Sequence, residues 1–139
     1  MTNKTSPSDK LKNVGLKITK ARLSVLAILA EVSRPVDVDE IERVFKKKRI
    51  AADQATIYRV LDALYQNKLI IRLDFHEGKF RYELKSDDDH HHLICQNCGR
   101  TEDVVDCPVN EFDEKIFSQK QFVVKQHALE FFGLCRQCQ

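Results

Sequence analysis

Two Cys-x-x-Cys pairs constrain this chain more than any other feature of its sequence. Cys95 and Cys98 form the first pair, and Cys135 and Cys138 form the second, with 36 residues between the pairs. Each pair can present two sulfurs on one side of a tight turn, so together they can close a tetrahedral four-thiolate site of the kind that holds structural zinc. A redox-active pair is the alternative, but it would sit at a strand-to-helix junction, and neither pair has that setting. We predict one structural Zn²⁺ per subunit.

The charge of the chain is distributed unevenly. Its 139 residues suffice for one ordinary domain or two small ones. Residues 1–85 hold 18 Lys and Arg against 11 Asp and Glu, a net charge of +7, whereas residues 86–139 hold 5 against 10, a net charge of −5. This asymmetry suggests that only the first half faces a polyanion, although a charged face is often merely solvated. All five cysteines lie in the acidic half, and the fifth, Cys107, is by default a buried or idle thiol.

The sequence predicts a cytoplasmic protein without a membrane partner. No apolar run approaches the roughly 18 residues of a membrane span. The polar residues 1–10 lack the apolar region of a secretory signal. In a reducing cytosol, paired cysteines bind metal or do redox work more often than they form structural disulfides.

The basic half reads as four helices. We predict a short helix at 10–14 that Gly15 ends, and a second helix that Thr19 caps and that stops before Arg34 and Pro35. Asp37 and Glu40 have the spacing of a capping box at the start of a third helix. A fourth helix runs from a cap at Asp53 to about residue 66. Its inward stripe has the i, i+3, i+4, i+7 spacing and consists of Ile57, Val60, Leu61 and Leu64.

The opposite face of the fourth helix has the composition of a DNA-reading surface. Small residues let a backbone approach the major groove, while a hydroxyl, a tyrosine and an arginine offer hydrogen-bond donors to bases and phosphates. An ordinary solvated surface is an equally good interpretation of this face alone. The residues concerned are Ala55, Thr56, Tyr58, Arg59 and Asp62.

Two alternating segments after the fourth helix predict a β-hairpin. A two-residue turn at Glu77-Gly78 would pair Phe75 with Phe80. The same register pairs Leu73 with Tyr82, Ile71 with Leu84, Asp74 with Arg81, and Arg72 with Glu83, so apolar residues meet each other and opposite charges meet. Three helices followed by a hairpin is the order of a winged helix, and we interpret residues 1–85 as a winged-helix DNA-binding domain.

The acidic half reads as a second domain. Residues 86–89 form an acidic hinge, and residues 90–139 form an α/β zinc-binding dimerisation domain, which makes the fold class α+β. We predict strands at 102–105 and 122–132 and a helix at 109–119. Apolar residues on both faces of the last strand exceed what so small a domain can bury alone, so a second subunit would supply the missing cover.

Three consecutive histidines precede the first cysteine pair. In an extended segment His90 and His92 point to one face, while His91 and Asp89 point to the other. Two histidines beside carboxylates suit a divalent transition metal. The alternative is that these histidines are solvated or make ordinary hydrogen bonds. We favour ligand roles for His90 and His92 and leave His91 open.

The sequence resembles the ferric uptake regulator family of bacterial metal-responsive repressors. The match runs in order from about residue 10 to the end of the chain. It is carried by four motifs: Gly15-Leu16-Lys17-Ile18-Thr19 with Arg22, then Ala55-Thr56-Ile57-Tyr58-Arg59-Val60-Leu61, then His90-His91-His92-Leu93-Ile94-Cys95-Gln96-Asn97-Cys98-Gly99, and finally Gly133-Leu134-Cys135-Arg136-Gln137-Cys138.

The resemblance implies a homodimer that represses metal-uptake genes (iron or zinc) or peroxide-stress genes by binding double-stranded operator DNA. It implies structural zinc on the four paired cysteines and a regulatory divalent metal (Zn²⁺, Fe²⁺ or Mn²⁺). The regulatory ligands it implies are Glu83, His90, His92 and Asp103, with a possible further site at Asp89, His91 and His127. The DNA-contacting positions are Lys17, Arg22, Thr56, Tyr58 and Arg59.

The chain departs from the family pattern at two positions. Many iron- and peroxide-sensing members supply a regulatory histidine where this chain has Pro35, which has no ligand atom. A carboxylate of the further site is replaced by Asn110, with Glu111 beside it. His76 is an outside candidate for the missing ligand, although the hairpin places it at the turn. These departures leave the identity of the sensed metal open.

Two other functional classes fit parts of the sequence. A zinc-ribbon-containing metal-dependent nuclease would need a catalytic histidine near a scissile phosphate, but the histidines lie on the acidic half. A zinc-ribbon interaction module without DNA binding would show no salt-sensitive DNA complex. We expect the repressor, which is not an enzyme.

Overall fold

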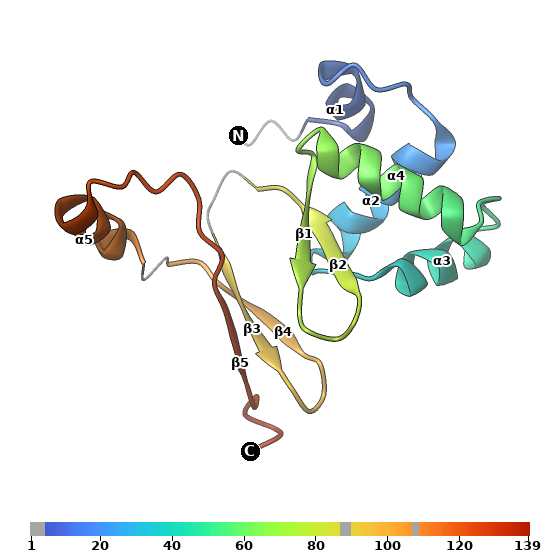
Figure 1. The fold of residues 1–139 in the computed structure, drawn as a ribbon. Helices are drawn as coiled ribbons and strands as arrows, with labels where there is room; N and C mark the ends of the chain where they lie inside the picture. The colour runs from blue at the N-terminus through green and yellow to red at the C-terminus, as the bar shows by residue number, and fades with distance from the viewer. Residues whose placement is uncertain (1–4, 87–89, 107–108) are drawn as a thin grey trace. The chain divides into compact units, whose positions relative to one another are not determined.

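The helices in the first half of the chain gather around one another (Figure 1), and their buried apolar residues form one core. This computed structural model describes residues 5–86, 90–106 and 109–139. The chain divides into two units, Met1–Lys85 (unit 1) and Ser86–Gln139 (unit 2). Unit 1 is a winged helix whose elements are α1 (Pro7–Asn13), α2 (Lys20–Val32), α3 (Val38–Lys47), α4 (Gln54–Gln66), β1 (Ile70–Asp74) and β2 (Phe80–Leu84).

The predicted helix caps of unit 1 are confirmed. The Thr19 hydroxyl accepts the Arg22 N–H at 3.2 Å, and the Asp53 carboxylate accepts the Thr56 N–H at 2.8 Å. Asp37 and Glu40 form the expected capping box. Each cap satisfies backbone donors that have no partner within the helix. The first helix begins earlier than predicted because the Ser6 hydroxyl caps it, but it still ends before Gly15, whose φ is +73°.

The inward stripe of α4 forms the centre of the unit 1 core. Its four predicted residues are all buried, and α4 packs against α2, α3 and β1. The wing hairpin is tied to the segment before α3 by two backbone hydrogen bonds between Val36 and Tyr82, of 2.7 and 2.9 Å. This core fixes which face of α4 points outward.

The predicted register of the hairpin is wrong by one residue. The strands pair Asp74 with Phe80 and Ile70 with Leu84, so five residues connect them rather than two. Because the side-chain period of a strand is two, this shift exchanges the two faces of β1. The exchange places Ile70, which is 1% exposed, on the same face as the buried Tyr82.

The predicted charge pairs across the hairpin are wrong for the same reason. Arg72 lies opposite Tyr82, and its guanidinium stacks 4.3 Å from the Phe80 ring centroid. Arg81 forms an ion pair with Glu77, at 2.7 Å, instead of with Asp74. The cross-strand neighbour of Glu83 is therefore Ile71 and not Arg72.

The described residues of unit 2 form a three-stranded sheet and a helix (Figure 1). The strand order is β4-β3-β5, in which β3 pairs antiparallel with β4 and parallel with β5. In Figure 1, α5 stands away from the sheet of its own unit. The elements are β3 (His91–Cys95), β4 (Thr101–Val104), α5 (Asn110–Lys120) and β5 (Glu130–Gly133).

The predicted strand at 122–132 is much shorter in the structure. Only Glu130–Gly133 pairs with β3, and residues 121–129 have no regular structure. Apolar residues occur on both faces of this segment, but only residues 130–133 pair with β3. Phe122 and Val123 consequently remain 62% and 57% exposed. Among the described residues, no helix has both the length and the apolar character needed to span a bilayer.

Candidate metal centres

The parallel pairing of β3 with β5 brings the two cysteine pairs together. The register places Cys95 beside Gly133, and the Gln96 N–H donates to the Gly133 carbonyl at 2.8 Å. Each pair closes a tight turn, with the Gly99 N–H bonded to the Cys95 carbonyl and the Cys138 N–H bonded to the Cys135 carbonyl. All four sulfurs lie within 4.8 Å of one another.

The spacing of the sulfurs fits a zinc ion. Sulfurs at the corners of a tetrahedron, each bonded to zinc at 2.3 Å, would lie about 3.8 Å apart. The Cys98 and Cys135 sulfurs are 3.8 Å apart. The structure therefore agrees with the predicted four-cysteine site, in which zinc would be held by Cys95, Cys98, Cys135 and Cys138.

The surroundings of the cluster stabilise one cysteine as a thiolate, whereas four thiolates together would need a bound cation. Backbone N–H groups of Cys135 and Cys98 hold the pKa of Cys95 at about 6. The pKa of Cys138 is lowered by a hydrogen bond with Asn97, but its hydrogen bonds with the other thiols and its burial raise it more, to about 11. Four thiolates this close repel one another unless a cation neutralises them, which is the role of a dication here.

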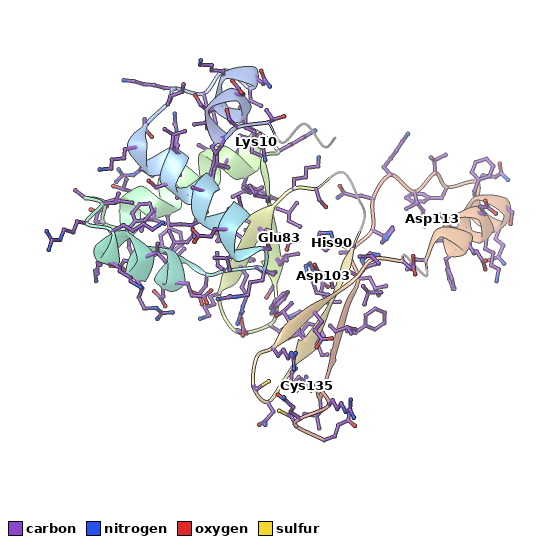
Figure 2. The ribbon with its side chains drawn as sticks, turned by 180° about the vertical axis from the view of Figure 1, so that it is seen from behind. Lys10, Glu83, His90, Asp103, Asp113 and Cys135 are labelled. Carbon is purple, nitrogen blue, oxygen red and sulfur yellow. The ribbon has the colours of Figure 1, made fainter. Side chains whose placement is uncertain are left out.

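A second set of donors lies at the start of β3 and on β4. The rings of His90 and His92 are 5.0 Å apart, and His92 Nε2 lies 3.8 Å from a carboxylate oxygen of Asp103, its cross-strand neighbour. His90 Nδ1 also lies 3.3 Å from the Ser86 hydroxyl. Figure 2 shows His90 and Asp103 near one another, at the end of the unit 2 sheet away from Cys135. Unit 2 therefore holds nitrogen and oxygen donors separate from its thiol cluster.

His91 points to the other face of the sheet and meets His127. Their Nε2 atoms are 3.2 Å apart, so one ring donates and the other accepts a hydrogen bond. A dication bonded to both nitrogens at 2.0–2.1 Å would hold them at about this separation. Asp89, the third residue of this predicted set, lies outside the described residues, as does Cys107.

Two further carboxylates need to be placed: Glu83, which was predicted to be a metal ligand, and Glu130, which was not. Glu83, a predicted regulatory ligand, is a buried residue of β2 in unit 1. Glu130 was not predicted to have a role, because its position depends on where β5 pairs. The sheet places it beside His92 on β5. Only the strand register could have identified it.

The outer face of α4 is exposed as predicted. Tyr58 is 49% exposed, and Arg59 is also exposed, whereas Thr56 is partly buried. In the first turn of α2, the Arg22 guanidinium donates to the carbonyl of Lys17, before that helix, at 2.7 Å, which holds these two predicted DNA-contacting residues together.

Comparison with known proteins decides the family of this chain. The model of the ferric uptake regulator family matches residues 13–132. The chain belongs to the ferric uptake regulator family. The ferric uptake regulation protein of Cupriavidus metallidurans is 35% identical over 131 residues, which cover 94% of this chain and 91% of that protein. Membership makes the chain a metal-responsive transcriptional repressor.

Solved structures of ferric uptake regulators share the fold. The Vibrio cholerae regulator has a TM-score of 0.80 and 28% identity, covering 90% of this chain and 96% of its own. The Helicobacter pylori regulator, which has three functional metal-binding sites, has a TM-score of 0.80 and 25% identity, covering 92% and 85%. The comparisons give no support to the nuclease alternative, because the family consists of transcription regulators.

Proposed function

We propose that this regulator binds double-stranded operator DNA as a homodimer when a divalent metal occupies the centre at His90 and His92. The observation that carries the proposal is the coexistence of two features in one family member. One is an outward α4 face with exposed Tyr58 and Arg59. The other is a set of histidine and carboxylate donors, distinct from the thiol cluster, that can respond to a metal.

The proposed DNA surface is the outer face of α4 together with the start of α2 and the segment before it. Tyr58 and Arg59 would enter the major groove, and Thr56 would contact the DNA at the start of the helix. Lys17 and Arg22 would bind phosphates, which position the protein without reading sequence. The net charge of +7 on residues 1–85 supports a polyanion as the partner of unit 1.

The proposed metal ligands are Glu83 from unit 1 and His90, His92 and Asp103 from unit 2. We infer that an ion bound by residues of both units restricts their relative motion and so sets the spacing of the two α4 helices of a dimer. A metal that favours the binding-competent form by about 5.5 kcal/mol would move its population from 1% to 99%. The donor set fits Zn²⁺, Fe²⁺ or Mn²⁺.

The exposed apolar side chains of unit 2 support a homodimer. In and around α5 and β5, large apolar side chains lie exposed to water. A second copy of the chain that covered them would remove this surface from water and so stabilise the dimer. The residues are Phe112, Phe117, Phe122, Val123, Phe131, Phe132 and Leu134, each at least 36% exposed. Because operator DNA is the ligand, the proposed place of action is the cytoplasm.

Fluorescence anisotropy with DNA from the protein's own promoter region tests the proposal. The zinc on the cysteines is kept in place, and Fe²⁺ (without oxygen), Mn²⁺ and Zn²⁺ are titrated separately at fixed salt. We expect tight, salt-sensitive binding that appears with one metal and that Arg59→Ala weakens. Lys125→Ala, which removes a charge from unit 2, should leave it unchanged. Equal binding with and without every metal would contradict the gating by metal.

A further inference from the structure

We propose that Glu130 is an additional ligand of the regulatory metal. With His92 and Asp103 it would form a row of three donors across the unit 2 sheet. The inference rests on the proposed function, because it assumes that His92 binds a metal. It adds a residue that lies in a different strand from every other predicted ligand.

The strand register carries this inference. His92 is in the central strand, β3, with Asp103 as its partner on β4 and Glu130 as its partner on β5. Residues paired in this way across neighbouring strands point to the same face of the sheet. A histidine that is 2% exposed is therefore flanked by a carboxylate on each side.

The distances across a sheet allow all three side chains to reach one ion. Neighbouring strands lie about 4.7–4.9 Å apart, and zinc binds nitrogen and carboxylate oxygen at about 2.0–2.2 Å. The Glu130 carboxylate is half-buried and makes no hydrogen bond or ion pair with the residues that the structure describes. Rotation among its ordinary rotamers would bring it toward His92.

The next row of side chains on the same face of the sheet is largely apolar. Ile94, which is 6% exposed, lies between Thr101 on β4 and Phe132 on β5. Charges beside such a layer are less screened than in water, so two carboxylates attract a dication strongly and repel each other without one. The row would therefore favour a bound dication.

This ligand changes what unit 2 can do alone. His90, His92, Asp103 and Glu130 supply two nitrogens and two carboxylates from one unit, a set that neutralises the charge of a dication. Unit 2 would then bind the metal without Glu83, and Glu83 would serve to couple the bound metal to unit 1. Removing Glu130 should weaken metal binding itself, whereas removing Glu83 should mainly weaken the effect of metal on DNA binding.

Cobalt binding to the zinc-loaded full-length protein tests the proposal. Co²⁺ at nitrogen and oxygen ligands gives visible absorption bands, and competition with a chelator gives its affinity. We expect Glu130→Gln to weaken Co²⁺ binding at least about tenfold and to change the visible spectrum. Glu130→Asp, which keeps the charge on a shorter side chain, should give an intermediate affinity.

Glu102→Gln is the matched control. Glu102 is also a strand carboxylate, but it pairs with Leu93 and so points to the opposite face, where it forms an ion pair with Arg100 at 3.2 Å. This variant should bind Co²⁺ within about twofold of the unmodified protein, because an exposed ion pair contributes little to stability. Unchanged affinity and spectrum in Glu130→Gln would overturn the proposal, as would an equal loss in Glu102→Gln. If Glu130→Gln loses its structural zinc or unfolds, the Glu130→Asp variant provides the test. A Co²⁺ affinity of Glu130→Asp equal to that of the unmodified protein would then overturn the proposal.

Two further measurements separate this proposal from the proposed function. His92→Ala should abolish Co²⁺ binding at this centre. If it does not, the centre itself is misassigned and both proposals fail. If Glu130→Gln weakens Co²⁺ binding while DNA binding of the unmodified protein is the same with and without metal, Glu130 is a ligand and only the gating by metal fails.

Discussion

Replacing Cys98 by serine should unfold unit 2 and leave unit 1 folded. The two units differ greatly in how much apolar surface they bury. The core cluster of 15 buried residues lies entirely within unit 1. Among the described residues of unit 2, Ile94 and Cys95 are the buried hydrophobic side chains. Metal binding must therefore supply much of the stability of unit 2.

The size of the stability loss in Cys98→Ser can be compared with what the small apolar core of unit 2 contributes. Burying Ile94 contributes about 1.5–3 kcal/mol, whereas structural zinc contributes about 10–16 kcal/mol to the folding of small domains. One of four equivalent ligands accounts for about 2.5–4 kcal/mol of that amount. Its loss is comparable with or larger than the contribution of Ile94 and corresponds to zinc binding weaker by about 100- to 1,000-fold.

Three measurements on the purified protein check this prediction. Zinc release to a chromophoric chelator reports the affinity, circular dichroism on heating reports the folding transitions, and sedimentation reports the subunit association. We expect Cys98→Ser to lose zinc and the transition of unit 2, to become monomeric, and to keep the transition of unit 1. Cys107→Ser, which changes the cysteine outside the two pairs, is the matched control and should keep its zinc.

The reasoning would be refuted by a Cys98→Ser protein that remains dimeric and keeps the unit 2 transition after its zinc has been removed. That result would mean that contacts with the second subunit, rather than zinc, hold unit 2 together. Loss of the unit 1 transition in the same variant would also contradict the prediction, because the core of unit 1 contains no residue of unit 2.

Three further predictions concern unit 1. Leu61→Ala removes a side chain that is fully buried in the core and should lower the free energy of unfolding by about 2–5 kcal/mol in urea titrations. Tyr58→Ala, on the exposed face of the same helix, should lower DNA affinity while changing stability by less than about 1 kcal/mol. Burial raises the pKa of Asp37, but hydrogen bonds from Lys79 and the Glu40 N–H lower it more, so its folded pKa lies below the ordinary 3.8. Asp37→Asn, which keeps a capping side chain, should therefore cost about 1–2 kcal/mol at neutral pH, and the difference should vanish as pH falls through the folded pKa.

The local features of this protein were readable from its sequence. The caps at Thr19, Asp37 and Asp53 and the inward stripe of α4 depend on residues within one turn or two of each other. The energies that specify them are local, so a short window of sequence contains the information. The spacing of the cysteine pairs was equally informative, because four thiols have few stable alternatives to a metal site in a reducing compartment.

The pairing of strands was decided only by the tertiary structure. Both hairpin registers preserve alternation, and the predicted one even matched opposite charges across the strands. The burial of Ile70 and the bonding of Tyr82 to Val36 selected the other register. The choice depends on packing against residues far away in sequence, which no local pattern records.

The same reason explains why Glu130 was not found from the sequence. The segment from residue 122 onward has apolar residues on both faces, and nothing in that pattern marks where pairing with β3 begins. The parallel register of β3 with β5 places Glu130 beside His92 and, by the same register, brings the two cysteine pairs to one end of the sheet. The sequence by itself determined which ligand types this protein has, and the non-local pairing of its strands decided which of them lie together.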